Sequence, residues 1–102
     1  MPTILGMRPS LAIAAHRDRV REIVLRHRAT NPRLCGSVVR GADVEGSDVD
    51  LLVEAGPSTT LLDLGAIQVE LEALLGVSVD VRTTGDLPDP VRARALSEAV
   101  PL

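Results

Sequence analysis

The spacing of apolar residues near the start of the chain predicts a helix. Ser10 is the expected N-cap, and apolar side chains recur at helical spacing from there to residue 27 or 28. Asn31-Pro32 then ends the segment, because the residue before a proline is biased away from helical backbone. Residues 1–9, which include one glycine and two prolines, are expected to form a loose arm.

Two further helices have clearer end signals. Thr60 and Asp63 have the spacing of a capping box, and Gly76 is typical of the position just after a helix. Leucine and isoleucine side chains at helical spacing give the segment between them, residues 61–75, one apolar stripe. A last helix is expected over residues 89–99, where an Asp-Pro pair supplies the N-cap and the first helical residue.

Three short segments have the pattern of strands. The first begins at Arg33 and ends at Cys35, the second comprises residues 48–53, and the third is residues 77–82, with three valines on one face and Ser, Asp and Arg on the other. Strands and helices in this order predict an α/β (α+β) fold, with a small mixed sheet packed against helices. The length of 102 residues suits a single domain.

The second strand opens with two acids, Asp48 and Asp50. Because side chains alternate along a strand, both carboxylates fall on one face with Cα atoms ~6.6 Å apart, while Val49, Leu51 and Val53 point into the core. Two acids on a buried strand are costly unless a cation neutralises them. Mg²⁺ is the expected cation, since it usually takes one or two carboxylates together with substrate phosphates.

The turn after the first strand has the features of a phosphate site. Gly36 lets a ligand approach the backbone closely, and Ser37 offers a hydroxyl and an N–H at what is expected to be the start of a helical turn. Arg40 adds a planar guanidinium that fits phosphate oxygens.

Together these motifs carry a family resemblance. GS at residues 36–37, ten further residues and DxD at residues 48–50 resemble the nucleotidyltransferase signature of the DNA polymerase beta superfamily. The residues flanking both motifs are similar to its small stand-alone branch, the minimal nucleotidyltransferases (MNT). The resemblance covers roughly residues 34–102 and implies a single minimal nucleotidyltransferase domain over residues 1–102. Members transfer a nucleoside monophosphate from a Mg-nucleoside triphosphate to a hydroxyl. Many are antitoxins paired with a HEPN-domain ribonuclease toxin, which some adenylylate on tyrosine.

The resemblance also implies residue roles. Asp48 and Asp50 would be ligands to two Mg²⁺ ions, and Asp80, on the neighbouring strand, matches the third carboxylate of the family. Asp80 would hold the metal nearer the attacking hydroxyl and take its proton, with ATP as the expected substrate. The residues expected to bind nucleotide phosphates are Gly36, Ser37, Arg40 and Ser47.

Three functions remain open at this point. The first is adenylylation of a cognate HEPN toxin, for which the intact acidic triad argues. The second is neutralisation of the toxin by covering it, with the chemistry idle. The third is small-molecule transfer of the antibiotic-modifying kind, whose members usually carry an extra helical domain. The sequence departs from the family at Cys35, where an aromatic residue often stands, and at Val38-Val39, and these changes affect contacts to the base.

Composition and charge limit the partners and the cellular location that are expected. The chain has no aromatic residue and a formal net charge of −3, so direct nucleic-acid binding is not expected. Its one cysteine, the lack of a long apolar run and the lack of a signal-peptide pattern predict a cytoplasmic protein without membrane contact. Residues 1–42 hold eight arginines against two acids. This basic first helix and the apolar tail at residues 100–102 are expected to be available for docking a partner.

Five other residues could be mistaken for site residues. Cys35 is expected to be a small buried residue, because no histidine lies nearby in sequence to activate a thiol. Asp43 and Glu45 are expected to be solvated acids of a polar loop. His16 and His27 lie three helical turns apart, ~16 Å along the axis, and cannot share a metal ion.

Overall fold

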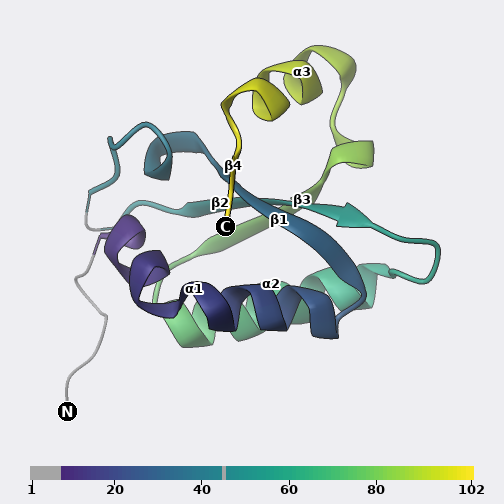
Figure 1. Ribbon diagram of the computed structural model, residues 1–102, viewed down its shortest axis with the longest axis horizontal. Coiled ribbons are helices and arrows are strands. Elements are labelled where there is room, and N and C mark those ends of the chain that lie inside the picture. The colour runs from purple at the N-terminus through teal and green to yellow at the C-terminus, as the bar shows by residue number, and fades with distance from the viewer. Residues whose placement is uncertain (1–7, 45) are drawn as a thin grey trace.

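The computed structural model describes residues 8–44 and 46–102 and has a four-stranded sheet with helices on both of its faces (Figure 1). In chain order the elements are α1 (Pro9–Arg26), β1 (Ala29–Cys35), the 3₁₀ turn η1 (Gly36–Val38), β2 (Val49–Ala55), α2 (Leu61–Leu75), β3 (Val79–Thr83), the 3₁₀ turn η2 (Thr84–Asp86), α3 (Asp89–Glu98) and β4 (Val100–Pro101). The predicted α/β class with a small mixed sheet is confirmed. The predicted loose arm lies mostly outside the described residues, and its last residue, Pro9, begins α1.

The order of strands in the sheet is β3-β2-β1-β4. β2 and β3 run parallel, with Asp50 opposite Asp80, whereas β1 runs antiparallel to β2, with Cys35 opposite Asp50. Three chain segments that are distant in sequence therefore meet at one place in the sheet.

The hydrophobic core lies between one face of the sheet and the pair α1 and α2, which run side by side beneath it (Figure 1). Val49, Leu51 and Val53 of β2 point into this core, as their alternation predicts, and are at most 2% exposed. α3 lies on the opposite side of the sheet, and none of its residues, all of which the structure describes, is fully buried. The acidic face of β2 is therefore the face toward α3.

The second helix matches its prediction at both ends. The Thr60 hydroxyl accepts the N–H of Asp63, and the Asp63 carboxylate accepts the N–H of Thr60, so the capping box is present. Gly76 adopts the left-handed conformation at φ 71° and closes the C-terminus. Arg28 also donates to Asp63 at 2.9 Å, and this contact attaches the end of α1 to the start of α2.

The start of the first helix differs from its prediction. Arg8 is the N-cap and Pro9 the first helical residue, so Ser10 is not a cap. The Ser10 N–H instead donates to Oδ2 of Asp43 at 2.9 Å, and Asp43 is only 2% exposed. The prediction that Asp43 is a solvated loop acid is therefore wrong. This carboxylate caps α1 from a loop 33 residues further along the chain, a partnership that no local pattern reveals.

The first strand is longer than predicted. It begins at Ala29, four residues before the expected Arg33, and Asn31-Pro32 interrupt its pairing with β2 as a bulge. Asn31 adopts a positive φ of 53°, which asparagine tolerates better than most residues. The proline predicted to end the helix is thus placed inside a strand, where a bulge accommodates its missing N–H.

The apolar tail is also more ordered than predicted. Val100 and Pro101 form β4, which pairs antiparallel with Leu34 and Arg33 of β1. The Leu102 N–H donates to the Pro32 carbonyl at 3.1 Å. The backbone of the tail covers the edge of the sheet, so it is not a free segment for docking.

Smaller differences concern helix ends and histidines. α3 has Pro88 as its N-cap, one residue earlier than predicted. α1 is kinked at His16, whose φ of −128° is not helical. The Nε2 atom of His27 is hydrogen-bonded to the carboxylate of Glu70 in α2, in line with a structural histidine. Within residues 8–44 and 46–102, no helix combines the length and the apolar character that crossing a bilayer demands.

The cap on α1 gives a stability prediction. Asp43→Ala should lower the free energy of unfolding by about 1 kcal/mol at neutral pH, because the N–H of Ser10 loses its acceptor. That hydrogen bond lowers the folded-state pKa of Asp43 below 3.8, so its contribution is full above about pH 5 and is lost as the pH falls through the folded pKa. Urea unfolding of both proteins at several pH values measures the difference. Asp18→Ala, at a 91% exposed side chain, is the control and should change little.

Candidate active site

The predicted phosphate turn begins where β1 ends. Gly36 has a φ of 75°, and η1 follows with the N–H groups of Val39 and Arg40 donating to the Gly36 carbonyl. The first N–H groups of such a turn, those of Ser37 and Val38, have no acceptor within it. The expected helical turn after the GS pair is therefore present, and its free N–H groups suit an anion.

Gly36 is also in close contact with Asp50. The register of β1 and β2 sets Cys35 opposite Asp50, and the Asp50 carboxylate reaches across to the Gly36 backbone. A Cβ at position 36 would overlap Oδ2 of Asp50. This contact requires a glycine, so the GS turn and the DxD strand are parts of one site.

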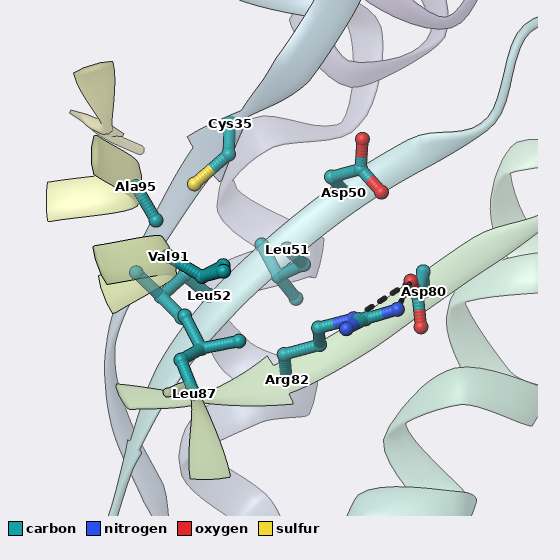
Figure 2. Close-up of a pocket in the computed structure, with 9 residues that line it drawn as sticks. All are labelled: Cys35, Asp50, Leu51, Leu52, Asp80, Arg82, Leu87, Val91 and Ala95. Atoms are coloured by element: carbon teal, nitrogen blue, oxygen red, sulfur yellow. Dashed lines mark hydrogen bonds and ion pairs between the residues drawn. The ribbon is translucent and has the colours of Figure 1, made fainter. Parts of the chain in front are cut away.

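Asp50 and Asp80 lie side by side on the two parallel strands (Figure 2). Burial raises the pKa of Asp50, and the negative charges of Asp80 and Asp48 raise it further. The guanidinium groups of Arg82 and Arg40 act in the opposite direction. The three predicted carboxylates thus share one electrostatic environment, in which the ionised form of Asp50 is disfavoured.

The three acids are not arranged alike. Asp48 lies just before β2, not in it as predicted, and is exposed, whereas Asp50 and Asp80 are half-buried. In the part of the chain that the structure describes, no three His, Cys, Asp or Glu side chains are gathered closely enough to hold a metal ion as they stand. The carboxylate oxygens nevertheless suit Mg²⁺, and a cation beside them would favour the ionised form of Asp50, which burial and the charges of Asp80 and Asp48 disfavour. Asp48, Asp50 and Asp80 are therefore the residues that could hold it.

Arg82 is a residue of this site that the sequence analysis did not single out. Its Nε and Nη2 atoms both lie 2.9 Å from Oδ2 of Asp80 (Figure 2). The signal was present in the alternation of the third strand, which puts residues 80 and 82 on the same face.

The other two predicted phosphate residues have partners within the chain. The Nη1 atom of Arg40 lies 3.6 Å from Oε2 of Glu98, at the end of α3. Ser47 closes the loop before Asp48, since its hydroxyl accepts the Val44 N–H at 2.9 Å. Arg40 still influences Asp50, since its charge lowers the pKa of that carboxyl.

A cavity of about 200 Å³ opens beside the carboxylates, between the sheet and α3 (Figure 2). Asp50, Asp80 and Arg82 form its polar end. Its apolar lining comes from β2, the segment before α3, and α3 itself, and includes Leu52, Leu87, Val91 and Ala95.

The sulfur of Cys35 also points into the cavity (Figure 2). Burial and then the charge of Asp50 raise the pKa of this thiol, so it stays protonated at neutral pH. Cys35 is half-buried and lines the cavity, so it is more exposed than the small buried residue predicted, and its raised pKa makes it a poor nucleophile, as expected.

A turn whose first N–H groups have no acceptor within it lies beside carboxylates on two adjacent strands, which is the arrangement expected of a nucleotidyltransferase. The family model described as "Nucleotidyltransferase domain" matches residues 14–102. The chain belongs to this family and is a nucleotidyltransferase.

Two relatives are similar over most of their length. The Methanocaldococcus jannaschii protein named "Putative protein adenylyltransferase MJ0435" is 41% identical over 78 residues, which are 76% of this chain and 84% of that protein. The Thermococcus cleftensis protein named "Protein adenylyltransferase MntA" is 35% identical over 88 residues, which are 86% of each.

Solved structures agree with this assignment. One described as "Structure of putative minimal nucleotidyltransferase" is 41% identical, with a TM-score of 0.84 over 91% of this chain and 95% of that one. A toxin–antitoxin complex solved with AMP-PNP contains a chain of the same fold, with a TM-score of 0.72 over 82% of this chain and 69% of that one. At 15% identity this second likeness concerns the fold alone.

The contact between Gly36 and Asp50 gives a second prediction. Gly36→Ala should lower nucleotidyl transfer about 100-fold, because its methyl group displaces the Asp50 carboxylate. Gly41→Ala is the matched control, since Gly41 has a similar φ of 69° but open space around it. Both variants should lose about 1 kcal/mol of stability from left-handed backbone strain. Equal transfer by the two variants, measured with labelled nucleotide, would show that the contact is irrelevant to activity.

Proposed function

We propose that this chain is a Mg-dependent protein adenylyltransferase that transfers AMP from ATP to a hydroxyl of a cognate HEPN-type ribonuclease toxin and so neutralises it. The observation that carries the proposal is the in-register pairing of Asp50 and Asp80 beside the Gly36 turn. Acids on adjacent strands next to free N–H groups suit a reaction in which a cation and a polyphosphate bind together.

In this mechanism the turn at Gly36 and Ser37 binds the β- and γ-phosphates through its free N–H groups, and Arg40 turns from Glu98 to assist. The acceptor oxygen forms a bond to the α-phosphorus while the bond to the bridging oxygen breaks, and pyrophosphate leaves. Asp80 accepts the proton of the hydroxyl. Two Mg²⁺ ions held by Asp48, Asp50 and Asp80 would neutralise the charge that develops on these oxygens.

Two arguments support a hydroxyl of a partner protein as the acceptor. The first is chemical: the cavity beside Asp80 has an apolar end next to a polar one, which suits a hydroxyl carried on an apolar side chain. The second is relationship, since relatives are named protein adenylyltransferases and chains of the same fold come from toxin–antitoxin complexes. A partner protein is the acceptor that both arguments favour, and the cytoplasm is the proposed location of the reaction.

A second candidate is neutralisation of the toxin by covering it, without chemistry. The internal ion pairs favour it, because Asp80 is engaged by Arg82 and Arg40 by Glu98. A single experiment distinguishes AMP transfer from neutralisation by covering.

The experiment mixes the chain with its HEPN toxin and Mg-ATP and measures intact masses. Wild type should add one or more AMP units to the toxin, and the double variant Asp48→Asn with Asp50→Asn should add none, because the metal-holding carboxylates are gone. Transfer by the purified double variant would refute the enzymatic assignment. Equal neutralisation by both proteins with no change of mass would establish the covering mechanism instead.

The same double variant should remain folded and should be at least as stable as wild type at pH 7 without metal. The folded pKa of Asp50 is raised above 3.8, so its ionised form costs stability as the pH rises through that pKa. Asparagine removes this cost, and the difference should shrink as the pH falls below 3.8, where the wild-type carboxyl becomes protonated in both states. Urea unfolding at pH 3 and pH 7 measures it, and a double variant that is unfolded at pH 7 would contradict the prediction.

A further inference from the structure

Arg82 places a positive charge directly beside the carboxylate of Asp80. Both residues belong to β3 and point to the same face of the sheet, toward the cavity (Figure 2). Two guanidinium nitrogens, Nε and Nη2, approach the single oxygen Oδ2 of Asp80 at 2.9 Å. A chelate of this kind holds the carboxylate in one orientation.

The surroundings explain why this contact forms. Asp50 lies opposite Asp80 in the adjacent strand, and two carboxylates at neighbouring strand positions repel each other. Arg40, the other cation close enough to lower the pKa of Asp50, is engaged by Glu98. Arg82 is thus the guanidinium that offsets the charge of this acidic pair most directly.

We propose that Arg82 is a positioning residue that holds the carboxylate of Asp80 until a divalent cation binds and then releases it to the cation. This inference rests on the proposed function, because it takes Asp80 as a ligand of the cation. The cation and the guanidinium compete for the same oxygen, so divalent binding is an exchange of one positive charge for another. The side chain of Arg82 is 60% exposed and has room to swing away from Asp80 once the ion arrives.

The exchange has two functional consequences. Arg82 keeps the carboxylate aimed at the site, so that no rearrangement of the strand is needed for the ion to bind. It also weakens the binding of a cation that arrives alone. The released guanidinium can then pair with a phosphate, which favours arrival of the metal together with the nucleotide.

The test measures Mn²⁺ binding by the whole chain without nucleotide, from the electron paramagnetic resonance signal of the free ion. Arg82→Gln should lower the Kd for Mn²⁺ by about two- to fivefold, the effect expected for removal of a partly exposed competing ion pair. Arg82→Lys keeps the charge but not the two-nitrogen chelate, so its Kd should fall less. Unfolding temperatures with and without Mn²⁺ give a second readout, and Arg82→Gln should gain more stability from the ion than wild type does.

The control is Arg94→Gln, which removes the same charge from an exposed position of α3. An equal fall in Kd for this variant would mean that net charge, and not the contact with Asp80, sets the affinity, and would overturn the inference. An unchanged Kd in a folded Arg82→Gln would overturn it as well. If Arg82→Gln does not fold, a Kd for Arg82→Lys at or above the wild-type value overturns it.

The same binding measurement tests the proposed metal site separately from the role of Arg82. If wild type has a saturable Mn²⁺ site that disappears in the Asp48→Asn, Asp50→Asn double variant, the proposed metal site stands whatever Arg82 does. If wild type has no such site, both the proposed metal site and the role of Arg82 fail.

Discussion

The structure depends on the parallel register of β2 and β3, which sets Asp50 directly opposite Asp80. Two carboxylates at neighbouring strand positions repel each other, so this register is stable only because stronger forces hold it. Those forces lie on the other face of the same strands, where Val49, Leu51 and Val79 are buried against α1 and α2. The apolar face thus holds in place an acidic face that would not pair on its own.

The electrostatics of the acidic face explain the rest of the site. Two arginines supply positive charge to this face: Arg82 contacts the carboxylate of Asp80, and Arg40 lowers the pKa of Asp50. Gly36 leaves the space that the Asp50 carboxylate occupies. Burial, followed by the charges of Asp80 and Asp48, still leaves the pKa of Asp50 raised. Carboxylates in this setting, next to a turn whose first N–H groups have no acceptor within it, are suited to bind a cation and a polyphosphate together.

The features that could be predicted from the sequence are those set by residues close to one another in the chain. The ends of α2 followed from Thr60, Asp63 and Gly76, and the shared face of Asp80 with Asp50 followed from strand alternation and the family resemblance. Asp43 could not be predicted as the cap of α1, because its partner lies 33 residues away. The pairing of β4 with β1 is likewise a long-range contact between segments whose own patterns are weak. Arg82 was predictable in principle, since it shares the face of Asp80.

The open side of the cavity is consistent with the proposed binding of a partner protein at this site. Its apolar lining is aliphatic, and Val91 on α3 is 50% exposed, so the wall that α3 provides is thin. The chain has no aromatic side chain to stack on a base, and aliphatic contacts bind a planar ring with little orientation. A nucleotide on this site would be held mainly through its phosphates, with the base and the acceptor left partly uncovered. A second surface that closes the cavity would exclude water and orient both reactants, which is the contribution that a protein acceptor makes simply by binding.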